Sequence, residues 1–516
     1  MFHYSKRAFP ILLNIRPLST DITSVPLTQA LSTFKPKSPL SSLANESSVK
    51  ITTLKNGLTV ASQNKFGMHC TIGAMIRAGP RYESGTISGT SHFLEKLGFH
   101  SSDGFKDRDH IQSTMESCNA IFDCQISRDF IVYAMSGVNH HLKTLTHVLS
   151  ETVMRPKITD EEVAMAARAI GFELVGMEMG PPVEPILNEL LHSAAFHASN
   201  TLGLPRYCPK ESLEKISRHE IMKFMASYYR PENTVLVGVG VDHDDFIQYV
   251  ESSFLPWDTS YGREVPESER LTPDKSTPVY LGGEMSVHRD LSQYHAPMPE
   301  FAHCAIGLEG CGSRDPQFVT ACLLNSLLGG GGSFSAGGPG KGMYTRLYTN
   351  VLNQYHWVNS AQAANHAYAD AGVFAISGSA EPEDLHHLVR VIINELRFTA
   401  ETPIGAGELQ RAKNQLESML LMNLEMNPVA FEDIARQVLA SGEWKPPSYW
   451  VEKINAVTAD DLHDLLARMF KSPITMVGYG RMDKWPKYQD IQQEFAAPLH
   501  SRTTTSRFPS IFKRFI

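Results

Sequence analysis

His69-Cys70-Thr71-Ile72-Gly73 recurs later in the chain as His303-Cys304-Ala305-Ile306-Gly307. Three further pairs of segments follow in the same order and at similar spacings: residues 133–137 with 374–378, 213–216 with 451–454, and 237–240 with 477–480. Ordered self-similarity of this kind indicates that a structural unit has been duplicated. The sequence therefore predicts two homologous domains.

Within each half, apolar runs that suit strands alternate with longer stretches that suit helices. Residues 71–78 predict a strand, whereas 160–178 and 210–229 predict helices. Thr159 or Asp160 is a suitable helix cap. Strands interleaved with long helices favour the α+β class, with two homologous duplicated domains that each hold a mostly antiparallel sheet covered by helices.

Turn-forming residues divide the chain into segments. Proline and glycine interrupt a charged stretch near 256–285, where we expect the joint between the domains. The expected layout is a transit peptide and flexible arm at 1–40, a first domain at 41–260, a linker at 261–285, a second domain with a glycine-rich segment at 286–500, and a polar basic tail at 501–516.

The N-terminal end of the chain has a composition of its own. Its first twenty residues contain Lys6, Arg7 and Arg16, no acidic residue, and several apolar side chains, which is typical of a mitochondrial transit peptide. The whole chain of 516 residues has a formal net charge of −8, and without these three bases the charge is −8 − 3 = −11. An acidic protein is a poor candidate for binding nucleic acid but a suitable host for basic peptides.

Neither a membrane span nor a disulfide framework is expected. No stretch reaches the roughly 18 consecutive apolar residues that a membrane-spanning helix requires, so any membrane contact would be peripheral. The seven cysteines include no Cys-x-x-Cys pair and are spread over the chain, which suits buried thiols in a reducing compartment.

The stretch Gly89-Thr90-Ser91-His92-Phe93-Leu94-Glu95-Lys96-Leu97 predicts a helix that follows a turn. At 3.6 residues per turn, His92, Glu95 and Lys96 share one face of this helix. In the pattern H-x-x-E-H, both histidines bind zinc and the glutamate serves as general base for the zinc-bound water. Lys96 stands in the place of the second histidine.

Glu173 lies on a helix predicted for 161–179, at about the separation at which such sites place a third zinc ligand. A lysine ammonium has three donors and no lone pair, and nearby carboxylates favour its protonated form. We therefore expect an ion-paired cluster of His92, Glu95, Lys96 and Glu173 where a zinc would sit, with no metal bound and no catalytic residue. An ordinary helix surface is the alternative for so short a string, and the duplicated setting argues against it.

A glycine-rich segment covers residues 329–342, between an apolar helix-like run at 318–328 and a helical segment beginning near Met343. Eight of its fourteen residues are glycine. Glycine loses the most backbone entropy on ordering, so the segment is costly to hold still and we expect it to move.

The glycine-rich segment has two other possible interpretations. A phosphate-binding loop is excluded because the pattern G-x-x-x-x-G-K-[ST] fails at Ser335 and at Gly342. A disordered linker remains the alternative, and Phe334 and Pro339 within the segment argue against it.

These features together resemble a known family, the alpha subunits of mitochondrial processing peptidases, which belong to the pitrilysin-type zinc peptidases. The resemblance rests on the duplicated halves, His92-Phe93-Leu94-Glu95-Lys96, Cys124-Gln125-Ile126-Ser127-Arg128-Asp129, and the run into Gly340-Lys341-Gly342-Met343. It covers roughly residues 50–495, and the glycine-rich segment is its most specific part. Lys96 is the usual residue of alpha subunits at this position.

The resemblance implies a heterodimer in the mitochondrial matrix, with at most peripheral association with the inner membrane. A beta subunit would carry the zinc and cut the basic presequences of imported precursors. This chain would hold no cofactor, would not itself be catalytic, and would recognise the substrate for the metalloendopeptidase complex. The substrate-binding residues implied for it are Gly329, Gly330, Gly331, Gly332, Ser333, Phe334, Ser335, Ala336, Gly337, Gly338, Pro339, Gly340, Lys341 and Gly342.

A cavity that receives a basic presequence should be lined with carboxylates. The chain has acids to spare, and for each of them singly a solvated helix face or loop is the alternative. They include Asp370, Glu381, Glu383, Glu425, Glu432 and Asp433.

Two other functions remain open at this point. The first is a structural core subunit of respiratory complex III, whose core proteins resemble the same family; the long glycine-rich segment argues against a pure scaffold. The second is a self-sufficient zinc metalloendopeptidase, in which another residue replaces the missing histidine; Lys96 argues against it.

Overall fold

The computed structural model describes residues 48–180, 182–196, 201–272, 276–292, 300–333 and 342–497. The expected transit peptide and arm at 1–40 and the basic tail at 501–516 lie outside these residues. So do residues 334–341 of the glycine-rich segment. Across the described ranges, no helix combines the length and the apolar character needed to cross a membrane.

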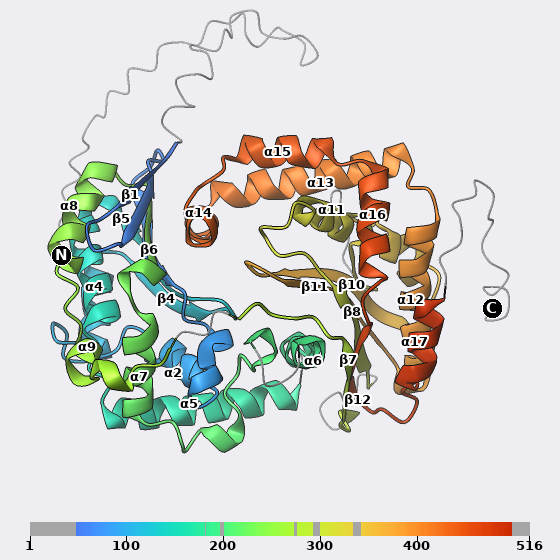
Figure 1. Ribbon diagram of the computed structural model, residues 1–516, viewed down its shortest axis with the longest axis horizontal. Coiled ribbons are helices and arrows are strands. Elements are labelled where there is room, and N and C mark those ends of the chain that lie inside the picture. The colour runs from blue at the N-terminus through green and yellow to red at the C-terminus, as the bar shows by residue number, and fades with distance from the viewer. Residues whose placement is uncertain are drawn as a thin grey trace, which may run out of the picture. The chain divides into compact units, whose positions relative to one another are not determined.

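The first half is built on a six-stranded sheet in the order β1-β2-β6-β3-β5-β4 (Figure 1). β2 and β6 run parallel, and the other neighbours are antiparallel. The strands are β1 Val49–Thr53, β2 Thr59–Gln63, β3 His69–Ile76, β4 Ile121–Ile126, β5 Ile131–Val138 and β6 Thr234–Val239. The helices are α2 Thr90–Leu97, α3 Arg108–Ser117, α4 Leu142–Met154, α5 Asp160–Met179, α6 Glu184–Phe196, α7 Arg218–Tyr228, α8 His243–Phe254 and α9 Ser260–Glu264.

The second half repeats this plan with the order β7-β12-β8-β11-β10-β9. Its parallel pair is β7 with β12. The strands are β7 Gly283–His288, β8 Ala302–Glu309, β9 Gly330–Gly332, β10 Val358–Ala367, β11 Gly372–Ala380 and β12 Thr475–Gly480. The helices are α11 Phe318–Leu328, a π-helix at Leu347–Leu352, α12 Leu385–Glu401, α13 Ala406–Glu425, α14 Asn427–Ser441, α15 Pro447–Ala456, α16 Ala459–Met469 and α17 Tyr488–Ala496.

The duplication predicted from the sequence reappears in the pairing of the strands. The repeated His-Cys segments form β3 and β8, and in each sheet the repeated cysteine lies opposite the repeated glycine. Cys70 faces Gly137 on β5, and Cys304 faces Gly378 on β11. The prediction of an α+β protein with two mostly antiparallel sheets covered by helices is confirmed.

One helix of each half packs on the sheet of the other half, as Figure 1 shows for α6 and α14. α14 packs on β6 and β3, where Phe431 is buried with Met75 and Val237. α6 packs on β12 and β8, where Leu191 is buried with Val477. Burial of apolar area drives this contact, so neither sheet can cover its inner face from its own half alone.

Two local predictions have different outcomes. α5 begins where expected, because the Thr159 side chain accepts the Glu162 N–H while the Glu162 carboxylate accepts the Thr159 N–H, a capping box. The helix predicted over 210–229 is wrong in its first part. α7 begins only at Arg218, where the side chain of Ser217 accepts a backbone N–H in the first turn.

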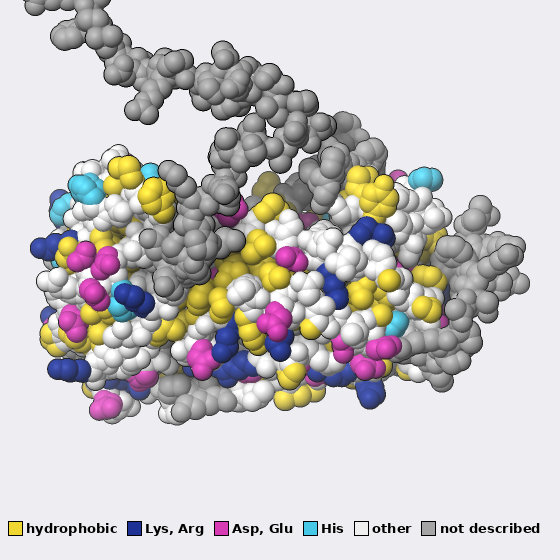
Figure 2. Space-filling view, turned by 90° about the horizontal axis from the view of Figure 1, so that it is seen from above, with side chains coloured by type: hydrophobic (Ala, Val, Ile, Leu, Met, Phe, Trp, Pro, Cys, Tyr) yellow, Lys and Arg dark blue, Asp and Glu magenta, His cyan; other side chains and the backbone are white. Residues whose placement is uncertain are grey.

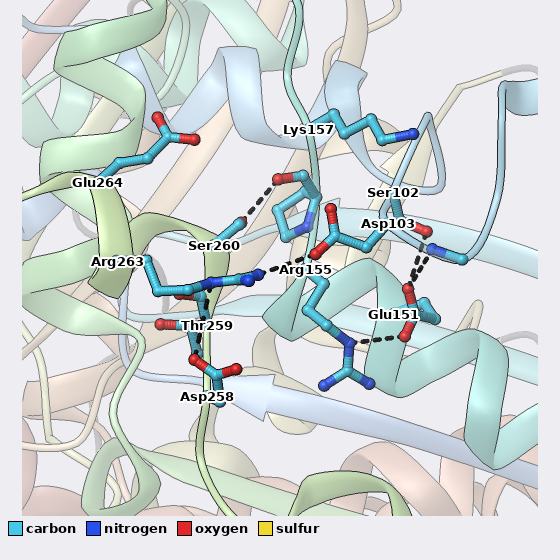
Figure 3. A network of polar contacts seen from close by, with 12 residues as sticks. Ser102, Asp103, Glu151, Arg155, Lys157, Asp258, Thr259, Ser260, Arg263 and Glu264 are labelled. Carbon is cyan, nitrogen blue, oxygen red and sulfur yellow. Dashed lines mark hydrogen bonds and ion pairs between the residues drawn. The ribbon is translucent and has the colours of Figure 1, made fainter.

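The turn-rich stretch after α8 is fixed to the first half by a polar network (Figure 3). Ser260 on α9 donates to the carbonyl oxygen of Pro156 at 2.7 Å, and Arg263 lies 2.8 Å from the Asp103 carboxylate. Beside them, Glu151 on α4 accepts from the Arg155 guanidinium at 2.6 Å. α9 lies at the start of the stretch expected as the joint, and these bonds attach it to the loop before α3 and to the end of α4.

Candidate functional site

The helix that carries the metal-like motif is α2, and a buried carboxylate holds its N-terminus. One oxygen of Glu83 accepts the Gly89 N–H at 2.7 Å, and the other accepts both the N–H and the hydroxyl of Ser91, at 2.6 and 2.5 Å. The free N–H groups and the helix dipole attract negative charge, but burial outweighs these hydrogen bonds and raises the pKa of Glu83 to about 7. Nothing in the spacing of the sequence pointed to Glu83, which is 2% exposed and is identified only from the fold.

His92, Glu95 and Lys96 lie on one face of α2, as the helical spacing predicted, and Glu173 of α5 lies beside them. The Lys96 Nζ is 2.7 Å from Oε2 of Glu173 and 3.2 Å from Oε1 of Glu95. The His92 ring is 1% exposed, with Nε2 3.4 Å from Oε2 of Glu173. The expected ion-paired cluster is therefore present, with Lys96 between the two carboxylates.

The pKa values in this cluster follow from its charges. Burial lowers the pKa of Lys96, but the hydrogen bond to Glu173 and the charges of both carboxylates outweigh burial and raise it above its ordinary value. Hydrogen bonding with His92 and with the Lys96 ammonium, opposed by partial burial, lowers the pKa of Glu173 to about 2. Lysine and glutamate are therefore both charged at neutral pH.

The hydrogen bonding of His92 also opposes metal binding. The Cys208 backbone N–H donates to Nδ1 of His92 at 3.1 Å, so Nδ1 is the acceptor of the neutral ring and Nε2, which faces Glu173, carries the proton. A zinc ligand must offer a lone pair, and neither this nitrogen nor the Lys96 ammonium does. The residues do not fit a catalytic zinc, and within the described part of the chain no three His, Cys, Asp or Glu side chains are placed to hold a metal ion.

A cavity of about 640 Å³ borders this cluster and lies between the halves. Tyr207 lines the cavity and touches the His92 ring edge-on, with ring centroids 5.5 Å apart. Glu184 and Glu189 contribute acidic groups to the lining, and Arg128 and Arg206 contribute basic groups. The charge of this cavity is therefore mixed.

Residues of the motif that ends in Arg128-Asp129 join elements that are far apart in the sequence. Arg128 donates to Glu189 on α6 at 2.6 Å. Asp129 accepts from Arg81 at 2.6 Å, and the same guanidinium makes two bonds of 3.0 Å to the Asp370 carboxylate in the second half. Residue spacing gave no sign of this contact between the halves, because its partners are separated by most of the chain.

Three of the acids expected to be spare already have partners. Asp370 is bound by Arg81, Glu432 lies 2.5 Å from the Arg436 guanidinium, and Asp433 accepts from Gln437 at 3.0 Å. On the face drawn in Figure 2, acidic and basic side chains are interspersed and do not form a patch of one sign. These three acids would have to exchange partners to meet a basic peptide.

The first part of the glycine-rich segment is a strand of the second sheet. Gly330–Gly332 forms β9, which pairs antiparallel with β10. Gly330 has a φ of +95°, and a side-chain carbon added there would collide with the carbonyl oxygen of Ala361. Ser333 continues the contact by donating its N–H to Asn359 at 2.8 Å. Pairing with β10 ties this part of the segment to the sheet.

The two ends of the segment also meet. The Thr345 hydroxyl accepts the Gly330 N–H at 3.2 Å, and the Thr345 N–H donates to Gly342 at 3.0 Å. The helical segment expected near Met343 begins later, as the π-helix Leu347–Leu352. The segment therefore leaves and returns at one place in the fold, and residues 334–341 lie outside the described residues.

The fold and the site together indicate a duplicated peptidase scaffold in which Lys96 replaces a metal ligand. Comparisons with known proteins agree. Residues 59–210 match the family model described as "Insulinase (Peptidase family M16)", and residues 215–416 match "Peptidase M16 inactive domain".

Relatives span nearly the whole described chain. The chain is 41% identical over 469 residues to "Mitochondrial-processing peptidase subunit alpha" of Bos taurus, covering 90% of this chain and 87% of that protein. The protein of the same name from Homo sapiens is 42% identical over 446 residues, with 86% and 84% covered. That from Caenorhabditis elegans is 37% identical over 457 residues, with 87% of each covered. The chain belongs to the family of mitochondrial-processing peptidase alpha subunits, within the M16 peptidases.

Proposed function

We propose that this chain is the non-catalytic, substrate-recognising subunit of a mitochondrial processing peptidase. The observation that carries the proposal is the Lys96 ammonium, which lies 2.7 Å from Glu173 and occupies the space where an active M16 site needs a second imidazole. With a charged lysine there, and with the ring nitrogen of His92 that faces Glu173 protonated, the cluster supports the helix packing of α2 on α5 and not hydrolysis.

The chemistry that this chain lacks must come from a partner. We propose a heterodimer in which a beta subunit holds zinc through an intact H-x-x-E-H motif and cuts presequences in the mitochondrial matrix. The basic, acid-free first twenty residues support import into mitochondria. The acidic balance of the remaining chain supports the attraction of basic presequences.

The glycine-rich segment is the proposed place of substrate contact, at residues 329–342. Thr345 bonds to both Gly330 and Gly342, so the two ends of the segment lie together, and this supports a role for the segment as one unit. Only that interior stretch is proposed to contact a presequence, because β9 is already committed to the sheet.

The test is a reconstituted dimer of this chain with a beta subunit, in which residues 335–340 are deleted while β9 and Thr345 are kept. We expect a rise in KM for a presequence peptide of at least about tenfold, equal to about 1.4 kcal/mol of lost binding. Peptide cleavage is followed in parallel with direct binding of the same peptide to this subunit alone.

Gly405→Ala is the matched control, since a side-chain carbon added there meets nothing within 4 Å. Unchanged KM and unchanged peptide binding after the deletion would count against substrate recognition by this segment. Stoichiometric zinc together with peptide cleavage by this chain alone would reject the non-catalytic assignment itself.

A further inference from the structure

A second cavity, of about 530 Å³, lies among the helices of the second half, at the seam with the first half. Its volume falls in the range of roughly 300–1,000 Å³ that small-molecule sites occupy. The walls are mostly apolar side chains of α11, α13 and α15, namely Phe318, Val319, Leu416, Leu420, Trp450 and Ile454. A mostly apolar surface of this kind suits a hydrocarbon chain better than water.

The guanidinium groups of two arginines line this cavity and bond to successive carbonyl groups at the end of α14. Arg77 donates to the carbonyl oxygen of Leu439 at 2.5 Å, and Arg314 donates to the next carbonyl, that of Ala440. Both carbonyls lie in the last turn of the helix, where intrahelical partners are lacking. Each arginine uses one nitrogen for this role, and a guanidinium has five N–H donors, so most of their donors remain for another acceptor.

Neither arginine is neutralised by a carboxylate. Among the ion pairs between described residues, none includes Arg77 or Arg314. Asp315, the acid that follows Arg314, is bound by Arg468 at 2.9 Å. Two positive charges at one end of an apolar cavity therefore lack a counter-charge within the described structure.

Of the other charged groups that line the cavity, three are in ion pairs, whereas the Asp433 carboxylate has only neutral hydrogen-bond partners. Asp129 is bound by Arg81, and Asp433 accepts from Gln437. Arg436 is paired with Glu432 at 2.5 Å, and Lys445 with Glu443 at 2.6 Å. Arg77 and Arg314 are thus the two cationic groups of the lining outside the ion pairs of the described residues, and Asp433 is the one acidic group there outside them.

We propose that this cavity binds a single-chain amphiphile with an anionic head, either a long-chain carboxylate or an alkyl phosphate. The head accepts hydrogen bonds from Arg77 and Arg314, whose planar forks match both kinds of oxyanion. The hydrocarbon tail lies against Val319, Leu420 and Trp450. No residue of the His92 cluster lines this cavity.

The test is calorimetric titration of the full-length protein with dodecanoate, dodecyl phosphate and dodecanol, each below its micelle-forming concentration. We expect both anions to bind more tightly than the neutral alcohol, and the tighter of the two identifies the head. The double variant Arg77→Gln/Arg314→Gln should weaken binding of the anions at least about tenfold and leave dodecanol unchanged. Arg314→Gln alone, at an exposed position, should give part of this loss without affecting the folding of the chain.

Two further variants complete the test. One probes the tail region of the cavity, and the other checks that the effect is specific to the arginines of the cavity. Val319→Trp fills the tail region and should reduce binding of all three probes, whereas Arg230→Gln removes an arginine outside the cavity and should change none. The proposal is overturned if the anions bind no more tightly than dodecanol. It is equally overturned if the double variant, with its melting temperature unchanged, binds dodecanoate and dodecyl phosphate as the native chain does.

Discussion

The Lys96 ammonium lies between the carboxylates of Glu95 and Glu173 and offsets the repulsion between their negative charges. Replacing Lys96→Met should leave Glu95 and Glu173 without the ammonium between them, and only Arg206, 4.0 Å from Glu95, would remain as a nearby cation. We expect a loss of about 1–2 kcal/mol in the free energy of unfolding at pH 7, less than for a fully buried pair because Glu173 is 32% exposed. Denaturant unfolding measures it. Lys445→Met is the control, since the pair of Lys445 with Glu443 is exposed and should contribute nothing measurable.

The lowered pKa of Glu173 makes its contribution depend on pH. Its folded pKa is about 2 against an ordinary value of 4.5, so the unfolded chain takes up the proton first as pH falls. The stabilisation is fully present above about pH 4.5 and is lost as pH falls towards 2. Unfolding free energies of the native chain and of Glu173→Gln should differ by a constant amount between pH 5 and 8 and converge below pH 4.5. A difference that persists unchanged to pH 2.5 contradicts this account.

Helix geometry made the cluster of His92, Glu95 and Lys96 predictable, because residues on one helical face are neighbours whatever surrounds them. The fourth member, Glu173, followed from its separation along the chain. The Cys208 N–H that sets the protonation of His92 could not be predicted in this way, since it depends on how a distant loop packs over α2. Glu83 was missed for the same reason.

Chain entropy and strand pairing lead to different expectations for the mobility of the glycine-rich segment. Entropy alone treats all eight glycines alike and predicts movement for each of them. In the fold, β9 gains backbone hydrogen bonds with β10, and Gly330 takes a left-handed φ that side chains disfavour. Strand pairing across the sheet is a long-range feature, and the local sequence does not carry it.

Two neighbouring glycines of β9 should therefore respond differently to the same substitution. Gly330→Ala places a methyl group against the Ala361 carbonyl at a φ of +95° and should lower the free energy of unfolding by about 2 kcal/mol or more. Gly332→Ala meets nothing within 4 Å and should change it by less than about 0.5 kcal/mol. Chemical denaturation of both variants decides the matter. Equal effects would mean that β9 is not held in the sheet.

For the molecule as a whole, the repeat predicted two domains of one architecture, and the two sheets do share a strand arrangement. The exchange of α6 and α14 between the halves was not predictable from the repeat. Internal similarity shows which segments are equivalent, but it does not show whether a helix packs on the sheet of its own half or on that of the other. That choice is decided by complementary apolar faces such as those of Phe431 and Met75.

The exchange makes each half dependent on the other for folding. A fragment of residues 48–272 keeps the first sheet but lacks α14, so Met75 and Val237 would face water. A fragment of residues 276–497 likewise lacks α6. Expressed alone, each should bind a dye for exposed apolar surface and unfold without a cooperative transition, because a large apolar patch is left uncovered.

Expressed together, the two fragments should co-purify, lose the dye binding and unfold cooperatively. Phe431→Ala in the second fragment should weaken their association, since truncating a phenylalanine that is 2% exposed costs about 3–5 kcal/mol. Glu443→Gln, just beyond the same helix at an exposed position, should leave the association nearly intact. Fragments that fold cooperatively on their own, with no dye binding, would show that the exchanged helices add contact between two domains that are already complete.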